Sequence, residues 1–292
     1  MTASRPRRPR AVSSGLASAP YMVQTNNGGR VERVAGFDAG RVMSQGFGAT
    51  RLPARLCSQN LGAATWLEFA FPESVVGHDD RVPIVDTTQL PWRCICQLVV
   101  DGLGAEQALG TGWLAGARTV FTAGHNLVSH KTGREATRIT VVPGRQVDLA
   151  PFDFFRSARF DVHPRWREQG DEDFDLGVIW LDAAVGEHLG WFGFGSRPDG
   201  QLNDLIVNTA GYPADKRLGT QWFNAGRIAE IEPRTLVYGL DTEAGQSGSP
   251  IFAVDARDER VVLAVHAYGG DAVNRGIRIT DDVFSLFSAW VR

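Results

Sequence analysis

Three short segments of this chain hold the side chains that a nucleophilic serine needs. His125 ends the segment Thr-Ala-Gly-His, Asp175 lies in Asp-Phe-Asp-Leu-Gly, and Ser247 lies in Gly-Gln-Ser-Gly-Ser-Pro. A serine hydroxyl is a poor nucleophile at neutral pH, so it needs a neutral imidazole to take its proton and a buried carboxylate to orient that imidazole. The three segments supply one group of each kind. We predict that the fold brings them together as a catalytic triad.

Each of these residues also has an ordinary structural interpretation. A lone histidine after an apolar strand is usually a core residue, a lone aspartate before a strand is usually a cap, and a Gly/Ser segment is usually a turn. Asp173 is an alternative to Asp175, but Asp175 directly precedes the apolar run that would bury it. The order His, Asp, Ser is that of chymotrypsin-type proteases and differs from the orders in subtilisins and in α/β-hydrolases. The three segments together therefore favour nucleophilic catalysis.

The neighbours of Ser247 suit an oxyanion hole. Small residues allow a tight turn, and we expect the N–H groups of Gly245 and Ser247 to point at the oxygen of the attacked carbonyl. The segment is not a lipase nucleophile elbow, because Ser249 stands where that motif needs Gly.

The formal net charge of −3 is unevenly distributed. Residues 1–73 hold nine arginines and four acidic residues, whereas the rest of the chain is net negative. The arginines of the first ten residues are typical of a solvated disordered arm, with nucleic-acid binding as the alternative. An acidic body is unlike a nucleic-acid-binding domain, and no apolar run reaches the ~18–20 residues that span a bilayer. We expect neither nucleic acid nor a membrane as a partner.

Three cysteines, Cys57, Cys94 and Cys96, do not make a disulfide framework. Cys94 and Cys96 stand two positions apart in an expected strand, so they point to the same face and are badly placed to pair. A metal site would need further Cys or His at fixed spacing, which the sequence does not show. We interpret these residues as small buried apolar side chains, and we expect neither a metal nor another cofactor.

The sequence predicts two regions, a largely irregular leader at 1–73 and a domain at 74–292. The first 30 residues lack the apolar core of an ordinary secretory signal, so export by another route, a start further upstream, or retention in the cell are all open. From about Pro91, short β-rich runs between turn signals predict an all-β sandwich or barrel. A final helix is predicted with Thr280 as N-cap and an apolar stripe over 283–291. The expected strands are Cys96–Val100, Thr119–Thr122, Ile139–Val142, Val178–Leu181, Leu205–Thr209, Leu236–Leu240, Pro250–Val254 and Val261–His266.

A series of motifs runs in order from about Ser74 to the C-terminus: Asp79–Val82, Asp86–Thr88, Thr111–Leu114, Thr122–His125, Gly211–Lys216, Gly219–Trp222, Asp241–Pro250, Leu263–His266 and Asn274–Thr280. In these motifs the chain resembles the glutamyl endopeptidases of bacilli and the staphylococcal V8-type proteases. The resemblance implies two antiparallel six-stranded β-barrels of the chymotrypsin type, one at about 90–190 and one at about 200–280, with a helix at 280–292. It also implies a serine endopeptidase that acts on proteins or peptides as a monomer without a cofactor. It implies an extracellular location, with a cytoplasmic one as the alternative.

The chain departs from that family at its disulfides. The bacillus-type enzymes carry a disulfide beside the catalytic histidine, and the matching positions here are Gly110 and Asn126. The loop between Phe252 and Leu263 lacks the second cysteine pair of the family. Loss of both cross-links is expected to remove some stability, and it weakens the argument for an oxidising compartment.

The resemblance implies cleavage after glutamate, or after aspartate. His266 matches a residue of the S1 wall that donates to the substrate carboxylate, and Thr242 matches a position that adds a hydroxyl. A buried carboxylate needs such donors because its desolvation is costly. Both residues also fit ordinary roles in a strand. Asp241 supports the alternative of Lys/Arg specificity, because trypsin-like enzymes carry a pocket aspartate at that distance before the serine.

The junction of the two regions suggests self-processing. Glu73 precedes Ser74, and related mature enzymes begin with a similar Ser-Val-Ile-Gly, so we expect cleavage between these two residues. The freed amine of Ser74 would then join the S1 site. A catalytically silent binding module and an intracellular regulatory protease with few targets remain as further hypotheses.

Overall fold

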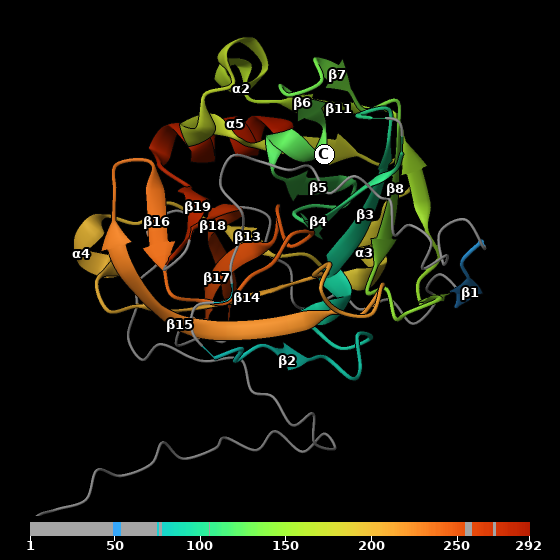
Figure 1. Ribbon diagram of the computed structural model, residues 1–292, viewed down its shortest axis with the longest axis horizontal. Coiled ribbons are helices and arrows are strands. Elements are labelled where there is room, and N and C mark those ends of the chain that lie inside the picture. The colour runs from blue at the N-terminus through green and yellow to red at the C-terminus, as the bar shows by residue number, and fades with distance from the viewer. Residues whose placement is uncertain (1–48, 54–74, 76–77, 105, 255–258, 271–272) are drawn as a thin grey trace, which may run out of the picture.

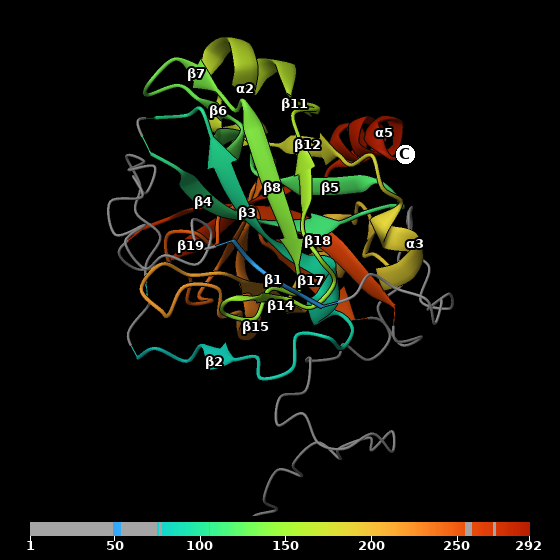
Figure 2. The same ribbon diagram turned by 90° about the vertical axis from the view of Figure 1, so that its right-hand side faces the viewer.

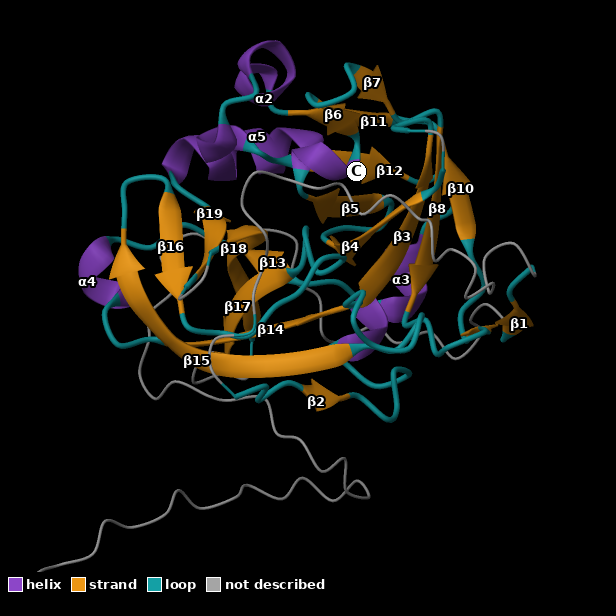
Figure 3. Ribbon diagram, viewed as in Figure 1, coloured by secondary structure: helices purple, strands orange, loops and turns teal. Residues whose placement is uncertain are grey.

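The computed structural model describes residues 49–53, 75, 78–104, 106–254, 259–270 and 273–292. Two antiparallel β-barrels lie side by side, and helix α5 (Asp281–Trp290) lies along the outside of the first barrel (Figures 1 and 2). The short helices lie at the periphery of the barrels (Figure 3). This architecture confirms the predicted all-β class with a C-terminal helix. Within the described residues, no helix has the length and apolar character needed to cross a membrane.

The first barrel is a nearly closed sheet of seven strands, not the expected six. One bent stretch accounts for the extra strand, since its two halves, β10 and β11, pair with opposite ends of the sheet. At the bend, the Trp180 amide donates to the Arg159 carbonyl at 2.9 Å, and the Ser157 hydroxyl donates to the Trp180 carbonyl at 2.6 Å. In sheet order the strands are β10 (Phe155–Ser157), β8 (Arg138–Pro143), β3 (Ile95–Asp101), β4 (Ala108–Leu114), β5 (Thr119–Thr122), β12 (Gly177–Trp180) and β11 (Phe160–Val162).

The second barrel closes fully with six strands, as predicted. β18 pairs with both β17 and β19, and this double pairing closes the sheet. Two short strands extend it: β13 (Gly193–Phe194) runs parallel to β18, and β2 (Val82–Pro83) pairs with the start of β15. The six barrel strands are β14 (Ile206–Gly211), β15 (Trp222–Ile231), β16 (Thr235–Tyr238), β17 (Pro250–Val254), β18 (Arg260–Gly269) and β19 (Asn274–Arg278).

Smaller elements connect and flank the barrels. A described part of the predicted leader forms β1 (Thr50–Arg51), which pairs with β9 (Leu149–Ala150) on the first barrel. Leu52 is buried there beside Ala150, although most of the leader lies outside the described residues. The remaining elements are β6 (Val128–Ser129), β7 (Arg134–Glu135), α2 (Pro164–Gln169), α3 (Val185–Leu189), α4 (Asp199–Leu202), and the 3₁₀ turns η2 (Trp92–Cys94), η3 (Gly124–Asn126) and η4 (Glu172–Phe174).

Helix α5 packs through its predicted apolar face. The Phe287 ring stacks on Phe121 of β5 with ring centroids 3.9 Å apart, and Val283 and Trp290 are also buried. Thr280 occupies the N-cap position as predicted. Its hydroxyl does not accept a hydrogen bond from a backbone N–H of the helix but donates one to the carboxylate of Asp282 in the first turn. The cap residue therefore orients an acidic side chain near the positive end of the helix dipole, where a negative charge is stabilising.

Strand β4 contains two glycines, a residue type that weakens a strand and so hides it in the sequence. Gly110 and Gly112 lie within β4 because the neighbouring elements pack directly against their α-carbons. A Cβ at Gly110 would meet the Asn126 side chain at 2.7 Å, and one at Gly112 would meet Val120 at 2.8 Å. Packing across the sheet, which the local sequence does not reveal, therefore sets these residue types.

Candidate active site

His125 and Asp175 are brought together by two neighbouring strands. His125 lies in η3, just after β5, and Asp175 lies just before β12, which pairs with β5. The His125 Nδ1 and the Asp175 Oδ2 are 2.5 Å apart, and the backbone N–H of His125 donates to Asp175 Oδ1 at 2.7 Å. Asp175 is fully buried. The carboxylate therefore holds both the ring and the backbone of the histidine, which is the arrangement that orients an imidazole for proton transfer.

The surroundings of this pair are aromatic and closely packed. Gly124 is required in the Thr-Ala-Gly-His segment, because a Cβ there would meet the Trp166 ring at 2.7 Å and Asp175 Oδ1 at 3.0 Å. The rings of Tyr268 and His125 have centroids 6.0 Å apart. Burial, and next the negative charge of Asp175, raise the pKa of Tyr268 above its ordinary value, so its hydroxyl stays protonated.

The loop that carries Ser247 joins β16 to β17 of the second barrel and contacts the first barrel. The Thr111 amide and the Asn126 side-chain amide both donate to the Ser247 carbonyl, at 3.0 Å and 2.9 Å. Gly248 adopts φ +89°, and a Cβ there would meet the Thr111 carbonyl oxygen at 2.1 Å. These contacts hold the backbone of Ser247 against the residue that follows His125. Transfer of the Ser247 proton to His125 stays a prediction.

The loop is also fixed at the expected oxyanion hole. Gly245 adopts φ +92°, which favours glycine, and its carbonyl accepts a hydrogen bond from the Thr111 hydroxyl at 2.8 Å. The Gln246 amide donates to the Glu243 carbonyl at 2.9 Å, and the Gln246 side chain accepts from the Glu243 amide at 3.1 Å. The conformation of residues 243–248 is therefore held by their own hydrogen bonds and by the first barrel.

The residues expected in the S1 site flank this loop. His266 is a fully buried residue of β18, its carbonyl accepts from the Gly248 amide at 2.7 Å, and its Nδ1 lies 2.7 Å from the Tyr238 hydroxyl. Thr242 is also fully buried, and its hydroxyl makes no hydrogen bond to any residue that the structure describes. Ser74, with Glu73 before it, lies outside the described residues.

Asp241 is engaged by the segment that precedes the first barrel. Its Oδ2 accepts a hydrogen bond from the backbone amide of Asp80 at 2.8 Å, and Asp241 is 2 % exposed. The chain itself thus provides a donor for the carboxylate on which the alternative of Lys/Arg specificity rests.

The cysteines of the described region are structural. Cys94 and Cys96 are buried and free, as predicted, and burial raises the pKa of the Cys94 thiol to about 12. The prediction that both lie in one strand was wrong, because Cys94 ends the turn η2 and only Cys96 belongs to β3. Cys57 lies outside the described residues, and the described part of the chain holds no group of three or more potential metal ligands.

Asn126 is a site residue that the sequence did not reveal. Its side chain fills the space beside Gly110, at the position where the resemblance places a disulfide. Its amide donates to the Thr122 hydroxyl and to the Ser247 carbonyl, both at 2.9 Å. The sequence marks the place only by the missing cysteine pair.

Comparison with known proteins gives a consistent result. The chain is 38% identical over 225 residues to a glutamyl endopeptidase of Bacillus licheniformis, covering 75% of this chain and 69% of that protein. It is 34% identical over 220 residues to a Bacillus subtilis protein named extracellular metalloprotease, covering 75% and 70%. A solved Glu endopeptidase structure matches 74% of this chain and 98% of its own with a TM-score of 0.65 at 23% identity, which supports the fold. No protein-family model matches the chain.

Proposed function

We propose, since this chain belongs to the glutamyl endopeptidase family, that it cleaves proteins and peptides after glutamate with Ser247, His125 and Asp175 as its triad. That the chain is a serine endopeptidase follows from its relatives and its chymotrypsin-like fold. The observation that best supports the triad is the distance of 2.5 Å between His125 Nδ1 and Asp175 Oδ2. The loop of Ser247 lies beside this pair, since its backbone accepts a hydrogen bond from Asn126.

In this mechanism the Ser247 oxygen attacks the peptide carbonyl while His125 takes its proton. The negative charge that develops on the carbonyl oxygen is stabilised by the N–H groups of Gly245 and Ser247. His125 then passes the proton to the leaving amine, and water releases the acyl group in a second, similar step. Asp175 stays ionised throughout and stabilises the imidazolium.

The contacts of His266 support glutamate at the S1 site. If the Tyr238 hydroxyl donates to Nδ1, the opposite nitrogen, Nε2, carries the ring proton and can donate to a carboxylate. The Thr242 hydroxyl, which makes no hydrogen bond to any described residue, offers a second donor. A substrate carboxylate bound there would accept a hydrogen bond from a buried hydroxyl that is otherwise costly to bury.

The bond from Asp80 to Asp241 argues against Lys/Arg specificity. A carboxylate that accepts a hydrogen bond from the chain's own backbone is less available to bind a substrate cation. The ratio of kcat/KM for matched peptides with Glu, Gln or Lys before the scissile bond separates the two hypotheses. The glutamate assignment requires the kcat/KM of the Glu peptide to be much higher than that of the Lys peptide.

Self-processing at Glu73–Ser74 is part of the same proposal. A glutamate at the predicted boundary would be a substrate for the enzyme itself. An extracellular role fits the name of the Bacillus subtilis relative, an extracellular protease. N-terminal sequencing of the purified active protein tests the site of processing. A start other than Ser74 would show that maturation does not occur at this bond.

Active-site titration distinguishes an enzyme from a catalytically silent binding module. A phosphonofluoridate should label the wild-type protein once per chain, and the labelled peptide should contain Ser247. Ser247→Ala should take up no label. Labelling at another residue, or none in a folded wild-type protein freed of its leader, would refute the assignment of Ser247.

A further inference from the structure

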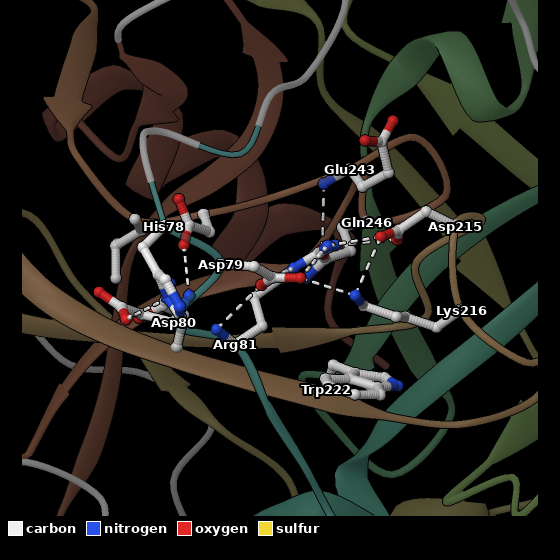
Figure 4. Close-up of polar contacts among 12 residues, drawn as sticks. His78, Asp79, Asp80, Arg81, Asp215, Lys216, Trp222, Glu243 and Gln246 are labelled. Atoms are coloured by element: carbon white, nitrogen blue, oxygen red, sulfur yellow. Dashed lines mark hydrogen bonds and ion pairs between the residues drawn. The ribbon is translucent and has the colours of Figure 1, made fainter.

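A buried arginine connects the segment before the first barrel with the second barrel. The Arg81 side chain is fully enclosed, and its guanidinium binds two carboxylates, each through two nitrogens (Figure 4). Arg81 Nε and Nη2 lie 2.9 Å and 3.0 Å from the Asp79 oxygens. Arg81 Nη1 and Nη2 lie 3.0 Å and 2.6 Å from the Asp215 oxygens. Bidentate pairs of this kind fix orientation as well as charge.

A second cation completes the cluster and balances its charge. Lys216 lies 2.6 Å from Asp79 and 3.2 Å from Asp215, and its ammonium group stacks over the Trp222 ring at 4.8 Å. Two cations and two carboxylates therefore neutralise one another. Burial opposes the charge on Arg81, but its hydrogen bonds to Asp79 and Asp215 outweigh that effect and raise its pKa, so the guanidinium is always charged.

The cluster and the residues beside it in the chain contact the Ser247 loop at three points. Arg81 Nη1 lies 3.4 Å from the Gln246 side-chain oxygen, which also accepts the Glu243 amide. Beside Asp215, the Ala214 amide donates to the Ala244 carbonyl at 2.7 Å. Next to Arg81 in the chain, the Asp80 amide donates to Asp241, as described above. Thr242 therefore lies between the held residues Asp241 and Ala244, and Gly245 lies between Ala244 and Gln246.

We propose that Arg81 is a positioning residue of this protease, which holds the S1 and oxyanion segment 241–247 in its productive conformation through Asp215 and Gln246. It does not touch the substrate. It acts by fixing the two peptide segments on either side of the loop, because a hydrogen-bond donor of an oxyanion hole is effective only at a defined distance from the reacting oxygen. The inference relies on the proposed roles of Ser247 and Gly245.

The test uses two substitutions that preserve size. Arg81→Lys keeps the charge but loses the bidentate hydrogen bonds to both carboxylates. Asp215→Asn keeps the shape but loses the ion pairs with Arg81 and Lys216. The matched controls are Arg159→Lys and Asp182→Asn, since these residues form an exposed ion pair at 2.8 Å on the first barrel. Each variant is titrated with a phosphonofluoridate. The labelling rate constant, the kcat and KM per titrated site, and the Tm are then measured.

We expect both cluster variants to lose about tenfold or more in kcat and in labelling rate per titrated site, since loss of a whole oxyanion donor costs roughly 100- to 1000-fold. The controls should stay near the wild type. A purely structural role would instead lower Tm and the titratable fraction while leaving kcat per site within about twofold, and that result would overturn the proposal. The labelling reaction needs no peptide, so Arg81 can be judged even if the enzyme does not prefer glutamate.

Discussion

The side-chain amide of Asn126 donates a hydrogen bond to the backbone carbonyl of Ser247 across 2.9 Å. The residue that follows His125 is thereby bonded to the backbone of Ser247, the proposed nucleophile. The same side chain fills the space beside Gly110, where the family resemblance implies a disulfide. At this place the chain has a hydrogen bond between the two barrels instead.

Substitution of Asn126 by Ala should impair both stability and catalysis. The Ser247 carbonyl keeps the Thr111 amide as a donor, so we expect a loss of only about 1 kcal/mol in the free energy of unfolding. The kcat should fall by about tenfold, because the nucleophile is less well placed. Asn126→Asp should be worse, since a carboxylate repels the carbonyl oxygen. Denaturant unfolding and kcat per titrated site measure the two effects. A wild-type kcat in both variants would show that this bond does not position Ser247.

The double variant Gly110→Cys/Asn126→Cys should form a disulfide in air. A Cβ on Gly110 would lie 2.7 Å from the Asn126 side-chain carbon, so a cysteine pair there has sulfurs within bonding reach. Closing a loop of this size stabilises a protein by roughly 3 kcal/mol. Mass spectrometry under native and reducing conditions reports the bond, and thermal melting reports its effect. The prediction fails if both thiols remain free, or if reduction leaves Tm unchanged.

Removal of the Tyr238 hydroxyl should weaken the preference for glutamate. In Tyr238→Phe the His266 ring loses the partner 2.7 Å from its Nδ1, so the tautomer that donates from Nε2 is no longer favoured. We expect the kcat/KM ratio of Glu to Gln peptides to fall by about tenfold, which corresponds to the loss of one charge-assisted hydrogen bond. Labelling of Ser247 by a phosphonofluoridate should be unchanged and serves as the control. An unchanged Glu/Gln ratio would remove His266 from the account of specificity.

The Asp79 carboxylate should make stability depend on pH in acid. Its hydrogen bond from Arg81 is the main cause that lowers its pKa below the ordinary value of 3.8. A depressed pKa stabilises the fold above pH 3.8, and this contribution is lost as the pH falls from there toward the lower, folded-state pKa. Asp79→Asn should therefore lower Tm at pH 7 by a few degrees, and the difference from the wild type should shrink below about pH 4. A Tm difference that is constant with pH would contradict this origin.

The sequence indicates the candidate triad more directly than it indicates the residues that contact the loop of Ser247. His125, Asp175 and Ser247 stand in segments whose chemistry is local, and the strands Thr119–Thr122 and Pro250–Val254 follow from short β-rich runs between turn signals. Asn126 and Arg81 have no local signal of this kind, because their partners lie 121 and 134 residues away in the chain. Long-range packing likewise decides the bend that divides β10 from β11, which accounts for the seventh strand of the first barrel.

The most direct test of the central claim is mass-spectrometric mapping of every bond that the enzyme cuts in a denatured protein, with Ser247→Ala alongside. We predict cuts after glutamate, with aspartate as a weaker site, and none in the variant. The same run reads the enzyme's own N-terminus, which should be Ser74. Cuts mainly after lysine or arginine, or the same cuts from Ser247→Ala, would contradict the account.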